Sequence, residues 1–272
     1  LAAIVKKLDN SGTPHYGASS AFSAATGLQL GDGVGGLGSR RGAYSAQVEA
    51  MTTQIAQTVV GVLDSTATTF GKAGGYTVKA AFADDKSKDP AWGALAILRG
   101  GRLIAGNDST YQRYADGTKG QELYLARVAA DVRTALDDIG LPTWATQLLD
   151  KLGKAPSIED LGKVVTQINA TQAALVNLGA TLPQLATLTG DSVNALVDAF
   201  GGIDNLSASA GNYLQSLYTD AERTAITTRQ ISEALGKFGA SMPTSREAYR
   251  ALVEAQDLST DSGRRLYAAL LQ

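Results

Sequence analysis

The chain has 272 residues, with 24 Lys and Arg against 26 Asp and Glu, a single His and no Cys. This balance gives no support to a polyanionic partner such as nucleic acid, and the lack of Cys excludes a disulfide framework, a thiol nucleophile and a Cys-ligated zinc site. No stretch approaches the ~20 consecutive apolar residues that a membrane-spanning helix needs. Aromatic residues make up only 6% of the chain, which favours slender helices in close contact over one thick core.

The two ends of the sequence interrupt predicted helices. The first ten residues, LAAIVKKLDN, open without Met and have the pattern of a helix that is already under way. The last residues, TDSGRRLYAALLQ, continue an amphipathic pattern that no Gly, Asn or Pro closes. We therefore expect this sequence to be a fragment of a longer chain at both ends.

Residues 1–41 are predicted to be a helix end followed by a glycine-rich flexible linker. The segment GLQLGDGVGGLGSR at 27–40 is rich in glycine. Glycine loses the most backbone entropy on ordering, so this segment is predicted to be the linker. Gly31, Gly33 and Gly36 come close to a dinucleotide-binding fingerprint. However, no predicted strand precedes them and no Lys-Ser/Thr closes a P-loop, so a linker is favoured over a phosphate-binding loop.

Residues 42–72 are predicted to form an amphipathic helix. Its apolar residues recur at intervals of four and three, which places on one stripe Tyr44, Val48, Met51, Ile55, Val59 and Val62. These intervals approximate a heptad, the pattern of helices that bury a seam against one another. We therefore predict that copies of the chain meet along this stripe. The alternative is that the stripe packs on later helices of its own chain.

Residues 73–118 are predicted to form a small β element with loops. YTVKAAFAD alternates apolar residues with others, as a strand does. ALAILRGGRLIAG contains two further short strands joined by Gly100-Gly101, a dipeptide that supplies the positive φ angles of a type I′ turn. A meander of about three strands at 75–107 is therefore expected to be the only appreciable sheet.

Two sets of side chains in this element have a functional interpretation beside a structural one. Asp84, Asp85 and Asp89 are acidic, but the segment lacks the spacing, the central Gly and the distal Glu of a calcium-binding loop, so a solvated loop is favoured. A basic and aromatic set of the kind that binds single-stranded nucleic acid is Arg102, Tyr111 and Arg113. The net charge of -2 favours a structural loop for this set.

Residues 119–272 are predicted to be a helical domain. Two of its shorter helices are expected at 191–200 and 204–218, and Asp137 and Asp138 are expected on the solvent-exposed face of its first helix. Capping boxes, in which a Ser or Thr and an acid three residues later cap a helix start, are predicted at Ser157–Asp160, Thr219–Glu222 and Thr244–Glu247. The predicted fold is mainly α, an elongated multi-helix assembly with one small β-meander around 75–107.

No residue is predicted to be catalytic, cofactor-binding or metal-ligating, and the chain is expected not to be an enzyme. A Ser or Cys triad needs a histidine base, and His15 lies among turn-forming residues with no nucleophile elbow nearby. We predict that His15 is a solvated loop residue. Zinc hydrolases draw on at least two histidines or thiolates, and no acidic residue lies in an apolar setting of the kind that raises a pKa for acid catalysis.

Several segments of the sequence follow one another in an order that is characteristic of one protein family. They are KAAFADDKSKDPAWGALAILRGGRLI, GQELYLARVAADVRTALDDIGLPTWATQLLDKLG, QINATQAAL, LVDAFGGIDNL, YTDAERTA and MPTSREAYRALVEAQDLSTDSGRRLYAALLQ. In this order they resemble the C-terminal region of tail tape measure proteins of long-tailed bacteriophages and prophages. The resemblance extends roughly from Lys72 to Gln272 and rests on many local phrases rather than on one short motif.

The resemblance implies a structural virion protein. Proteins of this family fill the tail tube, help to set its length and leave ahead of the DNA on infection, and their C-terminal part lies at the distal tip. The implied partners are further copies of the chain as a trimer, the distal tail protein, the baseplate hub, tail tube proteins and the host envelope, without cofactors or sequence-specific nucleic-acid binding. The implied locations are the tail lumen and tip, the host cytoplasm during assembly and the host envelope after ejection.

Two alternative functions stay open on the sequence. One is a cell-wall-degrading enzyme module that uses paired carboxylates, which a zymogram on purified cell wall would reveal. The other is a bacterial helical adhesin or secreted filament protein, which a secretion signal in upstream sequence would favour.

Overall fold

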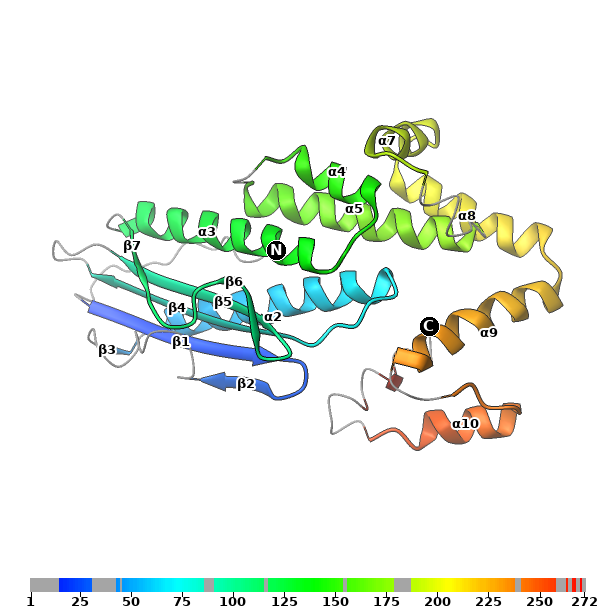
Figure 1. Cartoon of the computed structure of the whole chain (residues 1–272), viewed down its shortest axis with the longest axis horizontal. Helices are drawn as coiled ribbons and strands as arrows, with labels where there is room; N and C mark the ends of the chain where they lie inside the picture. The colour runs from blue at the N-terminus through cyan, green and yellow to red at the C-terminus, as the bar shows by residue number, and fades with distance from the viewer. Residues whose placement is uncertain are drawn as a thin grey trace. The chain divides into compact units, whose positions relative to one another are not determined.

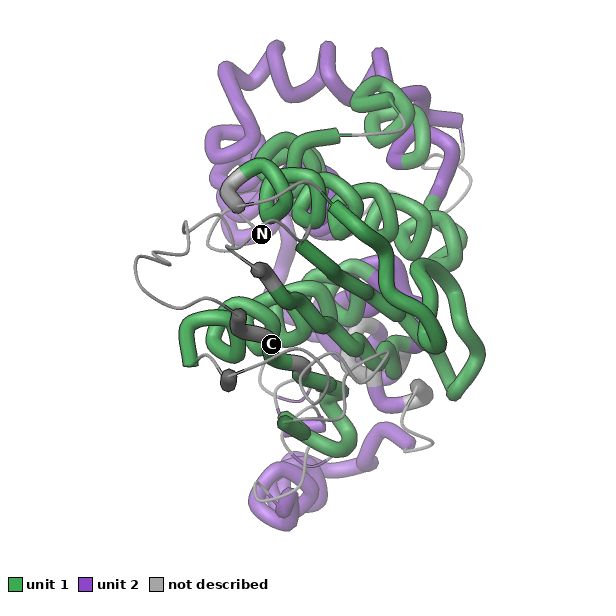
Figure 2. The backbone as a smooth tube through the Cα atoms, turned by 90° about the vertical axis from the view of Figure 1, so that its left-hand side faces the viewer, with its two compact units in different colours: residues 1–66, 74–141, 146–166 green, residues 67–73, 142–145, 167–272 purple. Residues whose placement is uncertain are grey.

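The computed structural model describes residues 15–30, 43–44, 46–85, 91–114, 117–153, 156–178, 187–237 and 241–257, together with Gly263, Leu266, Tyr267 and Leu270. Over these residues the chain forms eight helices and seven strands (Figure 1), which confirms a mainly α structure. The chain divides into two compact units (Figure 2). Unit 1 comprises residues 1–66, 74–141 and 146–166, and unit 2 comprises residues 67–73, 142–145 and 167–272.

Unit 1 contains one sheet. Its strands are β1 (His15–Ser23), β2 (Gly27–Leu30), β3 (Ala43–Tyr44), β4 (Tyr76–Asp85), β5 (Trp92–Arg99), β6 (Arg102–Gly106) and β7 (Gln112–Arg113). The strand order is β2-β1-β4-β5-β6, with antiparallel neighbours. The two-residue strands lie off this path, since β3 pairs in parallel with β1 and β7 pairs with β5.

The predicted meander is confirmed as β4, β5 and β6. The turn between β5 and β6 is the Gly100-Gly101 pair, with φ angles of 57° and 79°, as a type I′ turn requires. Residues with a Cβ atom are strained at positive φ, whereas glycine is not. The local sequence therefore determines where this hairpin reverses direction.

The prediction that 75–107 is the only appreciable sheet is wrong, because β1 and β2 extend it. All nine residues of β1 pair with β4, from His15 with Asp85 to Ser23 with Thr77. The segment 15–30 was predicted as part of a helix end and linker, and His15 as a loop residue. Instead, 15–23 and 27–30 are strands, and the turn between them ends at Gly27 with a φ of 72°.

Helices α2 (Ala46–Thr69) and α3 (Gly117–Asp138) cover the same face of this sheet. Successive side chains of a strand alternate between faces, and Ser20, Ala80 and Leu95 are aligned across β1, β4 and β5. The Ser20 hydroxyl bonds that of Thr52 on α2 at 3.0 Å. On the same face Phe82 lies against Tyr124 of α3, with ring centroids 5.1 Å apart.

The other face of the sheet carries a smaller apolar cluster. Its buried members are Ala81, Ala94, Ala96 and Leu98, with Trp92 and Tyr111 packed against them. The small alanines allow the rings of Trp92 and Tyr111 to lie close to the strands.

The remaining helices are α4 (Thr143–Asp150), α5 (Ile158–Asn177), α7 (Gly190–Ala199), α8 (Ile203–Leu217), α9 (Asp220–Lys237) and α10 (Arg246–Glu254). Within unit 2, an apolar cluster joins α5, α7 and α8 through Ala174, Val197, Leu206 and Ala210. The predicted helices at 191–200 and 204–218 correspond to α7 and α8, each displaced by one residue.

Two of the three predicted helix caps are present. The Ser157 hydroxyl accepts the Asp160 N–H at 3.1 Å at the start of α5. Thr219 and Glu222 bond reciprocally, since Glu222 Oε2 accepts the Thr219 N–H at 2.8 Å and the Thr219 hydroxyl accepts the Glu222 N–H at 3.3 Å. The third prediction is wrong by one residue, because Ser245 rather than Thr244 caps α10 and accepts the N–H of Ala248.

Candidate functional site

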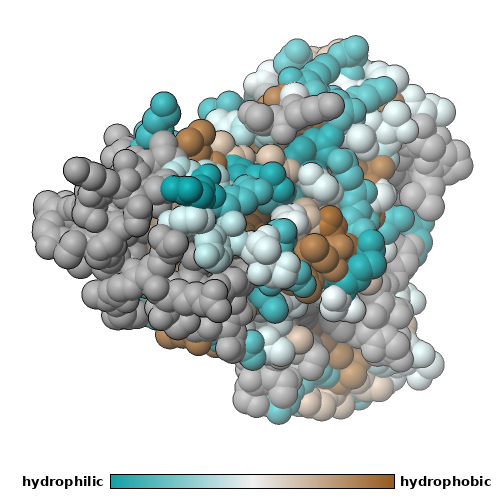
Figure 3. Space-filling view, turned by 60° about the vertical axis from the view of Figure 1, so that its left-hand side comes forward, coloured by the Kyte–Doolittle hydropathy of each residue, from teal (hydrophilic) through white to brown (hydrophobic). Residues whose placement is uncertain are grey.

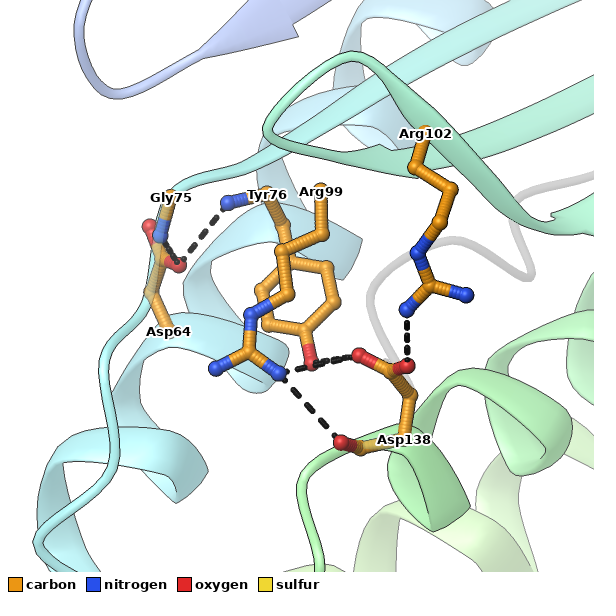
Figure 4. Close-up of polar contacts among 6 residues, drawn as sticks. All are labelled: Asp64, Gly75, Tyr76, Arg99, Arg102 and Asp138. Carbon is orange, nitrogen blue, oxygen red and sulfur yellow. Dashed lines mark hydrogen bonds and ion pairs between the residues drawn. The ribbon is translucent and has the colours of Figure 1, made fainter.

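A polar cluster of unit 1 joins the end of α3 to the β5–β6 hairpin (Figure 4). Asp138 is the last residue of α3, and Arg99 and Arg102 flank the Gly100-Gly101 turn. The two oxygens of the Asp138 carboxylate accept hydrogen bonds from Arg99 Nη1 at 2.9 Å and from Arg102 Nη2 at 2.7 Å. Arg99 Nη1 also donates to the Asp138 backbone carbonyl at 3.3 Å. One carboxylate thus holds both sides of the turn.

The tyrosine at the start of β4 completes this cluster. The Tyr76 hydroxyl donates to Asp138 Oδ2 at 3.4 Å, and the Arg99 guanidinium lies 5.2 Å from the centroid of the Tyr76 ring. At that distance the cation is attracted to the face of the ring. The end of α3 is therefore tied to β4 as well as to β5 and β6.

Burial and the contacts within this cluster shift the pKa values of Asp138 and Tyr76. Burial alone raises the pKa of a carboxyl group, but hydrogen bonds from Arg99 and Arg102 outweigh it and hold the pKa of Asp138 below its usual range. Burial raises the pKa of the Tyr76 phenol to about 12, with the Arg99 charge acting in the opposite direction. At neutral pH the cluster holds a carboxylate, two guanidinium cations and a neutral phenol.

A second carboxylate fixes the backbone at the start of β4. Asp64 Oδ1, on α2, accepts the N–H of Gly75 at 2.8 Å and of Tyr76 at 3.2 Å. A Cβ atom at Gly74 would lie 2.5 Å from the same oxygen, so the glycine leaves room for this carboxylate. The sequence therefore provides an anchor on α2 for the strand that carries Tyr76.

An ion pair between an exposed arginine and a buried aspartate lies on α3 one or two turns from Tyr124. Arg127 Nε donates to both oxygens of Asp131 at 3.0 Å, and the Asp131 side chain is only 8% exposed. Burial raises the pKa of Asp131, and the Arg127 guanidinium opposes that rise. The ring of Tyr114 lies 5.9 Å from that of Tyr124, and burial raises the pKa of Tyr114 to about 12. The Asp131–Arg127 pair lies within α3, whereas the two ion pairs of Asp138 join α3 to β5 and β6.

The stripe predicted as an interface is largely part of the core. Its six residues are Tyr44, Val48, Met51, Ile55, Val59 and Val62. Val48, Ile55 and Val59 have no exposed surface in the single chain, and Met51 is 5% exposed. Gln121 of α3 donates to the Met51 sulfur at 3.6 Å. A seam between copies along these residues would require α2 to leave its own sheet.

The two ends of the stripe differ from its centre. Val62 is half-buried on α2. Tyr44 was predicted to be helical, but it lies in β3, where it pairs in parallel register with Gly17 of β1. Four residues of the stripe are therefore core, and one lies on a strand.

The acidic and glycine-rich segments singled out in the sequence fall partly on described residues. Asp84 and Asp85 belong to β4 rather than to a loop. Asp89 and the predicted linker glycines, Gly31, Gly33 and Gly36, lie outside the described residues.

The structure separates the basic and aromatic side chains that the sequence placed in one set. Arg102 belongs to the Asp138 cluster, whereas Tyr111 and Arg113 lie around Trp92. The Tyr111 and Trp92 rings meet edge to face at a centroid distance of 4.8 Å, and the Arg113 guanidinium lies 5.0 Å from the Trp92 ring. Tyr111 and Arg113 thus stack within their own unit.

The Asp138 cluster was missed in the sequence. Asp138 was predicted to lie on a solvent-exposed helix face, but its side chain is 18% exposed and lies between two arginines. Its neighbour Asp137, at 52% exposed, does fit the prediction. The available signal was the pair of arginines on either side of a tight turn, which brings two like charges together and favours a carboxylate between them.

Comparisons with protein-family models, with curated proteins and with solved structures give no match. Within the described ranges, no three His, Asp or Glu side chains are grouped as metal ligands. No helix in the described part of the chain is long and apolar enough to cross a membrane.

Replacing Asp138 with Asn is expected to lower the free energy of unfolding at pH 7 by about 1–2 kcal/mol, a range that allows for the solvent exposure of Arg102. The folded-state pKa of Asp138 lies below its ordinary value, so its stabilising effect is present above about pH 4 and declines as the pH falls through the folded-state pKa. Urea denaturation at pH 7 and at pH 3 should show a smaller difference between the two proteins at the lower pH. The matched control is Asp137→Asn, whose effect should be smaller at pH 7.

Proposed function

We propose that the chain is a structural segment of a phage tail tape measure protein, positioned at the distal tip of the tail. The observation that carries a structural role is the pairing of charged side chains with one another in unit 1. Asp138 is bonded to Arg99 and Arg102, and Asp131 to Arg127. The Asp138 pairs join elements that are distant in sequence, and they thus serve to hold the unit together.

The assignment to phage tails in particular is supported by the order of sequence phrases from Lys72 to Gln272 that resemble this family. On this proposal the chain occupies the tail tube, helps to set tail length and is released for DNA delivery. Its partners are the distal tail protein, the baseplate hub, the tube proteins and further copies of itself, expected as a trimer. An elongated arrangement of the helices along the tube belongs to the same proposal.

The surface is compatible with a chain that is handled by several partners in turn. In the space-filling view, apolar areas are small and separated by hydrophilic ones (Figure 3). The most exposed large apolar side chain among the described residues is Leu217, at 70%. Apolar side chains scattered in this way are ordinary on a protein surface, and they are compatible with the proposed role.

Immunogold electron microscopy of phage particles tests this proposal. Antibodies against the purified chain are expected to label the distal ends of tails whose tips have been opened, and mass spectrometry of purified tails should detect its peptides. Label on cell-surface fibres or in a particle-free secreted fraction would instead support an adhesin or filament protein. Clearing of a peptidoglycan zymogram that is abolished by one Asp or Glu substitution would support the enzyme alternative.

A further inference from the structure

Strand β2 forms an edge of the unit 1 sheet and leaves two apolar side chains partly exposed. In Figure 1, β2 lies beyond β1, on the side away from β4. Leu28 pairs with Phe22 and Leu30 with Ser20, so both leucines lie on the face of the sheet that α2 covers over β1. Leu28 is 40% exposed and Leu30 is 52% exposed. The apolar face therefore continues past α2 onto an open edge.

β2 has four residues, and short length is one protection of an edge strand, but the described residues of this edge carry neither of two other common protections, charged side chains and proline. Natural edges are usually blocked by charged side chains, by proline or by a covering segment, because an unpaired strand edge is a template for further pairing. The four residues of β2 and their partners Ser20–Ser23 on β1 contain no charge and no proline. Among the described strands, none pairs with the outer edge of β2.

We propose that β2 pairs with β2 of a second copy of the chain and joins the two sheets into one. Antiparallel pairing centred on Gln29 places Leu28 opposite Leu30 of the partner subunit, and Leu30 opposite Leu28 of the partner subunit. The two-fold axis is then perpendicular to the sheet, so all four leucines lie on the face that carries α2 in both copies. This pairing covers each exposed leucine with another.

Two features select a second copy as the occupant. The strand is complementary to itself, because each leucine meets a leucine, and Gln29 meets Gln29 of the partner subunit on the opposite face. No charged residue of β2 lies near the axis, so identical strands do not repel one another. The proposal goes beyond the function proposed above and does not depend on it, since it rests only on the register and exposure of β2. Its two-fold contact is separate from the trimer expected there.

Disulfide trapping tests the proposed register, because the full chain contains no Cys. In Gln29→Cys the two thiols would lie directly opposite one another, at a Cα separation of about 4.5–5.5 Å, within the range that a disulfide spans. Mild oxidation is expected to give a covalent dimer at least about tenfold faster than in Leu103→Cys. Leu103 is the matched control, since it lies on the other edge strand, β6, and is 39% exposed.

A second variant separates pairing from folding. In Leu28→Lys/Leu30→Lys, four like charges would meet at the axis, so the dimer dissociation constant from analytical ultracentrifugation should rise by at least about tenfold. Circular dichroism should be unchanged, because both side chains are exposed. Leu103→Lys should leave the dissociation constant unchanged.

Three results would overturn the proposal. The first is a chain that stays monomeric at all concentrations while the Gln29→Cys and Leu103→Cys variants form covalent dimers at equal rates. The second is an oligomer whose stability the paired lysines do not alter. The third is hydrogen-exchange protection of the Leu28 and Leu30 amides that is independent of protein concentration, which would mean that the chain's own residues cover this edge.

Discussion

Replacing Gly106 with Ala is expected to lower the free energy of unfolding by about 2–5 kcal/mol, more than any other small substitution in the hairpin. Gly106 has a φ of 80°, and a Cβ atom there would lie 2.0 Å from the backbone carbonyl oxygen of Leu95. That oxygen cannot move away freely, because it accepts the N–H of Asn107 at 2.7 Å. The substitution therefore combines an unfavourable backbone conformation with a clash against a fixed atom.

The matched control for this variant is Gly101→Ala. Gly101 has nearly the same φ, 79°, but no atom lies within 4 Å of a Cβ built on it. Its cost should be only the backbone term, about 1–2 kcal/mol. Equal losses for the two variants in urea denaturation would show that the contact with Leu95 has no energetic effect.

Replacing Ile55 with Ala is expected to destabilise the chain by about 2–5 kcal/mol, as for other fully buried aliphatic residues. Ile55 has no exposed surface in the single chain, so the loss includes both the transfer of its methyl groups and the cavity left between α2 and the sheet. Ile55→Val, which removes one methyl group, should cost about 0.5–1.5 kcal/mol.

This experiment also distinguishes the core from an interface. If the α2 stripe is core, the denaturation midpoints of the wild type and of Ile55→Ala should differ by the same amount at all protein concentrations. If the stripe is a seam between copies, the difference should shrink at concentrations low enough to separate them. A concentration-dependent difference would restore the sequence-based prediction of a trimeric contact along this stripe.

The sequence predicted those parts of the fold that local chemistry determines. The β5–β6 hairpin could be located because two glycines with positive φ are needed at one place. The caps of α5 and α9 could be located because a hydroxyl and an acid three residues apart satisfy the first free N–H groups of a helix. The cap of α10 was displaced by one residue because Thr244 and Ser245 are adjacent and either hydroxyl can serve.

The parts that were missed depend on distant partners. Strand β1 is HYGASSAFS, rich in small residues with weak strand propensity, and it becomes a strand by pairing along its full length with β4. The partners of Asp138 lie 39 and 36 residues before it, and no local spacing connects them. The stripe on α2 was recognised as apolar, but periodicity alone does not tell whether a sheet of the same chain or another helix covers it.

The long separation between β1 and β4 has a consequence for how the newly made chain folds. Ser23 pairs with Thr77 and His15 with Asp85, so each pairing closes a loop of more than fifty residues, and such distant contacts slow folding. At the usual rate of synthesis, roughly 5–20 residues per second, β1 leaves the ribosome several seconds before its partner strand. We therefore expect β1 to dock last, onto a meander and helices that have already formed. Until then β4 is itself an open edge, and a nascent chain in that state is the species most exposed to mispairing with its neighbours on the same messenger RNA.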